Sequence, residues 1–280
     1  MIPHRARGGR QPAHVYRLRR AIAATLLVLV VFGILNLAGL AGGGGGEDAA
    51  TTTTLPVTTT TAVPPPACVE GDVVVTDNPA TGWATVVVDT ERSLPDWYAP
   101  PDLTNISEAG FPFTDGMALR GFVMPDLSAM REAAAANGTP ISVLAAYRSY
   151  ARQADLFERR VEEMGASEAG SRVARPGHSE HQLGTTLDVG DEGATDVDQA
   201  WGASPTGQWI ASHAHEFGFL ISYPAGAEER TCYDFEPWHL RYVGRELAAA
   251  VIASGRTLRE HLFAIATPAA PTSTTVAPAG

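Results

Sequence analysis

The chain has 280 residues, 45% of them hydrophobic, and its 31 acidic and 20 basic residues give a formal net charge of −11. All 31 acids but only 14 of the basic residues follow position 41, so this part carries a formal charge of −17. Such an acidic surface argues against charge-driven binding to nucleic acid or to anionic lipid head groups. The length suffices for one ordinary domain with additional segments.

The first 41 residues are typical of a membrane anchor. Six arginines fall within residues 1–20, and residues 21–41, AIAATLLVLVVFGILNLAGLA, carry no charge. About 20 apolar residues suffice for a helix to cross a bilayer, and a positive flank stays in the cytoplasm. We expect a cytoplasmic basic tail at 1–20 and a single-pass signal-anchor helix at 21–41, which hold an extracytoplasmic domain at the cell membrane. A signal peptide cleaved near AGLAGG is the alternative.

Low-complexity sequence predicts disorder on both sides of a single folded domain. Residues 42–66 form a Gly/Thr/Pro linker, and residues 267–280 form a tail of similar composition. We therefore expect one catalytic domain at 67–266. Outside the cell, Cys68 and Cys232 are expected to form a disulfide, with two free thiols as the alternative.

Within this domain, the residue patterns predict alternating short strands and helices. Runs of β-branched residues indicate strands, while apolar periodicity with proline near the start and glycine at the end indicates helices. In chain order we expect strands at 72–76 and 83–88, a helix at 125–137, a strand at 141–146, a helix at 150–164, a strand at 183–189, and helices at 207–217 and 241–253. This order favours an α+β fold in which a small antiparallel sheet, flanked by helices, carries the site.

Three segments concentrate the residues that could carry chemistry: AYRS at 146–149, RPGHSEHQLGTTLD at 175–188 and EPWHLRYVG at 236–244. A catalytic zinc ion takes three nitrogen or oxygen ligands and keeps a position open. His181, Asp188 and His239 could supply these ligands, and Glu236 could act as a base near them. The HExxH signature is absent, and scattered histidines and aspartates are weak metal signals, so the residues alone leave this interpretation open.

In this order the segments resemble the VanY-type D-alanyl-D-alanine carboxypeptidase family of peptidase M15, subfamily B. SEHQLGTTLD fits the family pattern S-x-H-x-x-G-x-x-x-D, EPWHLRYVG fits the second signature, and AYRSYARQ fits the upstream arginine motif. The resemblance covers residues 121–244. It implies a hedgehog/DD-peptidase-like fold with Zn2+ held by His181, Asp188 and His239.

The resemblance also implies catalytic roles for two residues. Glu236 would be the base that activates water, and Arg148 would polarise the scissile carbonyl and hold the oxyanion. Tyr147, Ser149, Gln153 and Ser179 lie in the motifs and are expected to contact the substrate, with a purely structural role as the alternative. Glu180 has the same alternatives, since it could position the peptide or the ligands.

The expected function is removal of the C-terminal D-alanine from peptidoglycan stem peptides during cell wall remodelling, by a monomer. An L,D-carboxypeptidase acting on tetrapeptide stems is the nearest alternative, because the same motifs serve both cleavages in this family. An endopeptidase is a third possibility. A non-catalytic peptidoglycan-binding module is a further alternative, although such a module would not need Glu236 beside the metal.

Overall fold

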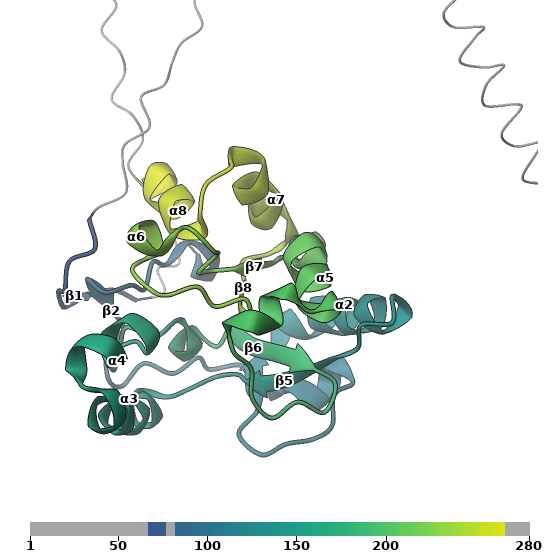
Figure 1. Cartoon of the computed structure of the whole chain (residues 1–280), viewed down its shortest axis with the longest axis horizontal. Coiled ribbons are helices and arrows are strands. Elements are labelled where there is room, and N and C mark those ends of the chain that lie inside the picture. The colour runs from purple at the N-terminus through teal and green to yellow at the C-terminus, as the bar shows by residue number, and fades with distance from the viewer. Residues whose placement is uncertain (1–66, 77–81, 267–280) are drawn as a thin grey trace, which may run out of the picture. The chain divides into compact units, whose positions relative to one another are not determined.

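The computed structural model describes residues 67–76 and 82–266, which belong to one compact unit (Figure 1). The predicted basic tail at 1–20, anchor at 21–41, linker at 42–66 and tail at 267–280 lie outside the described residues. Within the described ranges, no helix is both long and apolar enough to cross a membrane. The predicted domain organisation therefore stays a prediction.

A four-stranded antiparallel sheet forms the centre of the fold (Figure 1). Its strands, in spatial order, are β5 (Ile141–Ala145), β6 (Thr186–Asp191), β8 (His239–Tyr242) and β7 (Phe219–Ile221). Two smaller pairs accompany it: β1 (Val73–Val74) lies parallel to β2 (Arg92–Ser93), and β3 (Leu103–Asn105) lies antiparallel to β4 (Ala118–Arg120). The predicted α+β fold with a small antiparallel sheet is confirmed.

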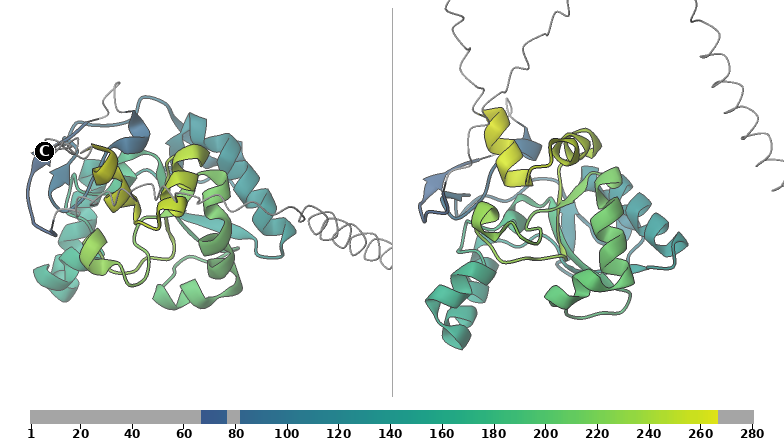
Figure 2. Two further views of the ribbon diagram at one scale, coloured as in Figure 1. Left: turned by 90° about the horizontal axis from the view of Figure 1, so that it is seen from above. Right: turned by 45° about the horizontal axis from the view of Figure 1, so that its top comes forward.

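Helices cover this sheet and extend beyond it. The α-helices are α2 (Met124–Ala136), α3 (Tyr150–Met164), α4 (Ala166–Arg172), α5 (Pro205–His213), α6 (Glu228–Thr231), α7 (Arg245–Ser254) and α8 (Leu258–Ala266). Short 3-10 helices are η1 (Trp83–Thr85), η2 (Ile106–Ala109), η3 (Gly121–Val123), η4 (Glu180–Leu183), η5 (Gln199–Ala203) and η6 (Ala214–Phe217). Helices α2 and α5 lie side by side in both views of Figure 2.

The two faces of the central sheet have different roles, because side chains alternate along a strand. Leu187 and Val189 of β6 and Leu240 and Tyr242 of β8 belong to the main hydrophobic core, together with residues of α2 and α5. The intervening residues, such as Asp188, therefore point to the opposite face. This alternation reserves one face of the sheet for packing and leaves the other for polar side chains.

Four predicted elements differ from the structure. Residues 83–85 form η1 instead of a strand, and the Trp83 ring stacks on the Tyr242 ring with centroids 5.4 Å apart. The helix predicted from position 241 begins at Arg245, because residues 239–242 pair with β6 and β7 as β8. Gly244, with φ of 83°, allows the sharp change from strand to helix.

The predicted strand at 183–189 begins later than expected. Residues 180–183 form η4, which ends at Gly184 in the left-handed region with φ of 71°. A Cβ atom at this position would lie 2.9 Å from Pro100 Cγ, so both the backbone and the packing require glycine. The helix predicted at 207–217 is α5 up to His213, followed by η6.

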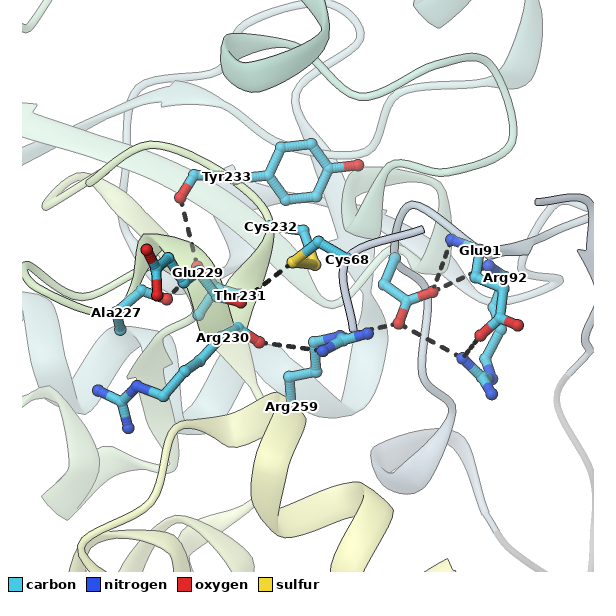
Figure 3. Close-up of a disulfide and its surroundings, with 11 residues drawn as sticks. Cys68, Glu91, Arg92, Ala227, Glu229, Arg230, Thr231, Cys232, Tyr233 and Arg259 are labelled. Carbon is cyan, nitrogen blue, oxygen red and sulfur yellow. Dashed lines mark hydrogen bonds and ion pairs between the residues drawn. A yellow bond between two sulfur atoms is a disulfide. The ribbon is translucent and has the colours of Figure 1, made fainter. Parts of the chain in front are cut away.

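A disulfide between Cys68 and Cys232 joins the first described segment to the residues after α6 (Figure 3). Arg259 of α8 strengthens the same region: its Nε lies 2.9 Å from Asp89 Oδ2, and its Nη1 donates to the Arg230 carbonyl oxygen at 3.0 Å. Both Arg259 and Asp89 are buried. The N-terminal part of the domain, α6 and α8 are therefore tied together.

Candidate metal centre

Backbone pairing brings the three predicted ligands together. Asp188 on β6 lies directly opposite His239 on β8, and cross-strand partners share one face of a sheet. His181 comes from η4, and the glycine turn at Gly184 leads from this helix into β6. The SEHQLG motif thus forms a short helix and a glycine turn, which together place His181 next to the start of β6.

The ligand atoms of the three residues converge on one point. His181, Asp188 and His239 each offer one atom, and these atoms all lie within 4.8 Å of one another. Asp188 Oδ1 is 3.3 Å from His181 Nε2 and 3.4 Å from His239 Nδ1. The two imidazole rings are perpendicular, with centroids 5.0 Å apart. Both histidines are buried.

The other ring nitrogen of each histidine has its own partner. His181 Nδ1 lies 2.8 Å from the Ala146 carbonyl oxygen, which accepts its proton. His239 Nε2 lies 3.1 Å from Glu180 Oε2. These bonds orient the rings, and they direct His181 Nε2 and His239 Nδ1 toward Asp188.

These residues fit a zinc ion. Asp188 Oδ1 is buried, yet it accepts no hydrogen bond. A buried carboxylate oxygen without a partner is costly unless a cation or donor meets it. Two imidazole nitrogens and one carboxylate oxygen form the donor set of a catalytic zinc site, which keeps a fourth position for water or substrate.

The electrostatics of the ligands agree with this donor set. Burial lowers the pKa of His181, which favours the neutral imidazole that a metal requires. Burial alone would raise the pKa of Asp188, but the neighbouring His181 and His239 lower it, so the carboxylate stays ionised. The nitrogen of His181 and the oxygen of Asp188 are therefore both in the protonation state that binds a cation.

Glu236 lies beside these ligands on the segment that leads into β8. Its Oε2 is 3.4 Å from His239 Nδ1, and burial raises the pKa of Glu236 to about 8. Its backbone N–H donates to the Tyr223 carbonyl oxygen at 3.0 Å, which fixes the segment. A carboxyl group whose pKa lies near neutrality can both accept and return a proton.

Arg148 approaches the ligands from the end of β5. Its backbone N–H donates to the His181 carbonyl oxygen at 3.2 Å, and its Nη2 lies 3.9 Å from Asp188 Oδ2. Its Nη1 donates to Gln153 Oε1 at 2.9 Å, and Gln153 Nε2 donates to the Ala174 carbonyl oxygen at 2.6 Å. Gln153 is almost fully buried, so it holds the arginine in place.

A cavity of about 200 Å³ opens in front of the ligand atoms. Its lining includes the three ligands, Glu236 and Arg148, and also Gln153, Ser179, Trp238, Arg160, Arg172, Tyr223 and Tyr233. A second hollow of about 570 Å³ shares Arg160, Arg172, Glu236 and Trp238 with it. The space beside the site can therefore accept an extended ligand.

Two of the predicted substrate contacts do not line this cavity. Ser149 Oγ accepts the Arg152 backbone N–H at 3.4 Å as the N-cap of α3, and it does not line the cavity. Tyr147 also lies outside the lining, and its backbone N–H bonds to the Ala118 carbonyl oxygen. Of the four predicted contacts, Gln153 and Ser179 reach the cavity.

Sequence reasoning did not assign Tyr223 and Tyr233 to the site. Their rings pack together with centroids 4.9 Å apart, and the Tyr223 ring lies 4.7 Å from the His239 ring. Neither tyrosine belongs to a motif, and only the tertiary fold brings them to the cavity. Glu180 lies in a motif, but its partners are distant in the sequence: Ser222 directly follows β7, and Arg241 lies on β8.

Comparisons with known proteins find similarity to carboxypeptidases. Residues 117–245 match the family VanY, D-alanyl-D-alanine carboxypeptidase. The putative carboxypeptidase YodJ of Bacillus subtilis (strain 168) is 35% identical over 179 residues, which are 62% of this chain. The matched region spans 65% of the length of YodJ.

Two solved structures resemble the chain. The LdcB LD-carboxypeptidase is 34% identical with a TM-score of 0.57, and the match covers 63% of this chain and 84% of LdcB. A variant of the vancomycin resistance D,D-pentapeptidase VanY from the VanB-type cassette, solved in complex with Zn(II), is 28% identical with a TM-score of 0.55. That match covers 64% of this chain and 99% of the neighbour.

Proposed function

The chain belongs to the VanY family of D-alanyl-D-alanine carboxypeptidases, and we propose that it is a zinc-dependent carboxypeptidase. Its proposed reaction removes the C-terminal D-alanine from peptidoglycan stem peptides. The observation that carries this proposal is the convergence of His181, Asp188 and His239 on one point, with Glu236 beside them. Bound there, zinc would polarise the scissile carbonyl and acidify the attacking water.

Glu236 supplies the proton transfers of this reaction. Its carboxylate lies at the ligand atoms and lines the cavity, where it takes the proton of the attacking water. The same carboxyl group then returns the proton to the amine of the leaving D-alanine. A single group can serve both steps because burial raises its pKa to about 8, close to neutrality.

Arg148 stabilises the negative charge that develops on the carbonyl oxygen. Its guanidinium faces the cavity, and its contact with Gln153 fixes its direction before substrate binds. A donor held in place needs little reorganisation in the transition state, which is why such donors accelerate acyl transfer. Ser179 and Gln153 also line the cavity, and both stay predicted contacts for the peptide.

A second candidate is L,D-carboxypeptidase activity on tetrapeptide stems. The similarity to the LdcB LD-carboxypeptidase, at 34% identity, favours it. The catalytic groups would act in the same way, since the two reactions differ in the configuration of the residue before the scissile bond. Turnover of a pentapeptide ending in D-Ala-D-Ala, compared with turnover of the matching tetrapeptide, decides between them.

The location of this activity is a further part of the proposal. The arginine-rich segment 1–20 and the apolar segment 21–41 support a single-pass anchor with a cytoplasmic N-terminus. A monomer anchored in this way would act on the cell wall during its remodelling. Protease treatment of intact cells tests this topology: the domain is degraded if it is extracytoplasmic and protected if it lies inside.

The activity itself is tested by mass spectrometry of stem peptides after incubation with the full-length chain. The proposal predicts release of D-alanine that is lost on treatment with a chelator and in the variant His181→Ala. The disulfide and a thermal melt serve as folding controls for the variant. Hydrolysis that continues at the same rate without zinc would refute the proposed mechanism.

A further inference from the structure

The two ring nitrogens of His239 both face carboxylates. Nδ1 lies 3.4 Å from Asp188 Oδ1, whereas Nε2 lies 3.1 Å from Glu180 Oε2. A neutral imidazole carries one proton, and only its proton-free nitrogen can bind a metal. When the proton is on Nε2, where Glu180 accepts it, Nδ1 presents its lone pair to the candidate zinc position.

Glu180 is itself buried and held by two further donors. Arg241 Nη1 donates to Oε1 at 2.8 Å, and Ser222 Oγ donates to Oε2 at 2.6 Å. Arg241 is only 1% exposed, and its Nη2 donates to the Val86 carbonyl oxygen at 2.6 Å. The carboxylate therefore has a compensating charge and a fixed direction, as a buried ion requires.

The strand geometry explains why these groups meet. His239 and Arg241 are two residues apart on β8, so both side chains point to the polar face of the sheet. Ser222 directly follows β7, and its backbone N–H donates to the His239 carbonyl oxygen. The sheet thus places the ligand His239 and the support Arg241 on β8, and the support Ser222 directly after the neighbouring strand β7.

The other ligand histidine is oriented in a different way. His181 Nδ1 bonds to the Ala146 carbonyl oxygen, which is a neutral acceptor. A carboxylate draws the imidazole proton more strongly than a carbonyl does, and it raises the basicity of the opposite nitrogen. The bond from His239 to the metal should therefore depend on a side chain that does not touch the metal.

We propose that Glu180 is a positioning residue of the metal centre, which acts through His239 by fixing its tautomer and strengthening its bond to zinc. Arg241 and Ser222 hold the carboxylate in place for this role. The inference rests on the proposed zinc site. It goes beyond that site because it assigns part of the zinc affinity to a residue outside the ligand set.

The test compares zinc affinities of the full-length chain and its variants by competition with a chromophoric chelator. The substitution Glu180→Gln keeps the shape of the side chain but removes its negative charge. The amide NH₂ group of the glutamine must then face an N–H donor of His239 or Arg241, where the carboxylate oxygen had accepted a hydrogen bond. We expect zinc to bind about 10- to 100-fold more weakly. The kcat should fall while KM is nearly unchanged, and the absorption of the cobalt-substituted protein should shift.

Ser222→Ala is the matched control, because it removes one donor to the same carboxylate and leaves the charge. Its zinc affinity should stay closer to that of the wild type than to that of Glu180→Gln. If Glu180→Gln binds zinc as tightly as the wild type does, with an unchanged cobalt spectrum, the inference is overturned. An equal loss of affinity in Ser222→Ala would also overturn it, since packing rather than charge would then matter.

A double variant, Glu180→Met with Arg241→Met, guards against failure to fold. Replacing a buried ion pair by apolar residues avoids an uncompensated charge and is often tolerated. This variant should fold, as judged by its thermal melt, and still bind zinc more weakly; wild-type affinity in it would refute the role of Glu180. A wild-type chain that binds zinc but cleaves no stem peptide would refute the proposed function instead.

Discussion

Removal of the disulfide offers a quantitative test of how the domain is held together. Cys68 and Cys232 are 164 residues apart in the sequence, so the bond closes a loop through most of the domain (Figure 3). Loop-closure entropy for that length corresponds to about 5 kcal/mol at 25 °C, which is the upper end of measured disulfide contributions. We expect the double variant Cys68→Ser with Cys232→Ser to lose between about 2 and about 5 kcal/mol of unfolding free energy.

The region around the bond explains why the loss should be partial. Arg259 bonds to Asp89 and to the Arg230 carbonyl oxygen, so α8 still links the N-terminal segment to α6 after the disulfide is removed. Neither cysteine lines the cavity at the candidate zinc site. The variant should therefore bind zinc normally at temperatures well below its unfolding transition.

The assay is urea unfolding of the full-length chain and of the double variant, followed by circular dichroism without reductant. Wild-type protein treated with reductant provides a second comparison, because it loses the bond without a change of sequence. A difference in unfolding free energy below about 1 kcal/mol would refute the reasoning, since the cross-link would then restrict the unfolded chain very little.

Three further predictions concern the site. Glu236→Gln should lower kcat by about 100- to 10,000-fold in a D-alanine release assay, with zinc binding retained; a loss of less than tenfold would contradict its role as the base. Arg148→Ala should lower kcat by about 100- to 1,000-fold in the same assay, whereas Arg152→Ala on α3, which does not line the cavity, should not. Burial lowers the pKa of His239, but the neighbouring carboxylates of Asp188 and Glu180 raise it to about 10. Zinc must displace that proton, so its affinity should weaken as pH falls from 8 to 6; pH-independent binding would contradict this.

The long, strongly periodic elements were predictable from the sequence. The helix expected at 150–164 is α3 with the same bounds, and the strand expected at 141–146 is β5 to within one residue. Both elements have local signals. The helix has an N-cap serine and a C-terminal glycine, and the strand is a short apolar run. Such signals act within a few residues and need no knowledge of the rest of the chain.

The elements that depend on tertiary pairing were not predictable. All four residues of β8, HLRY, are buried, although two of them are charged or polar. Arg241 can lie inside the protein only because Glu180 meets it there, at a separation of 61 residues. The sequence pattern favoured a helix from Arg241 onward, because a local pattern contains no information about a partner as distant as Glu180. Strand β7, only three residues long, gave no signal for the same reason.

The residues of the candidate site also fall into those that the sequence predicts and those that only the tertiary fold brings to the cavity. The motifs placed His181, Asp188, His239 and Glu236 in one constellation, and the structure brings their side chains together. Ser149 does not line the cavity, because its hydroxyl accepts the Arg152 backbone N–H at the start of α3. Tyr223 and Tyr233 reach the cavity only through the folded chain, so no local pattern could have identified them.

The central claim is that zinc held by His181, Asp188 and His239 drives cleavage of a stem peptide. Its most direct test measures bound zinc and D-alanine release in the same preparation of full-length protein, before and after chelation and after zinc is restored. The account predicts one zinc per chain at this site, with release that disappears and returns with the metal. Release that persists in the stripped protein, or a zinc-loaded chain that cleaves neither pentapeptide nor tetrapeptide, would contradict it.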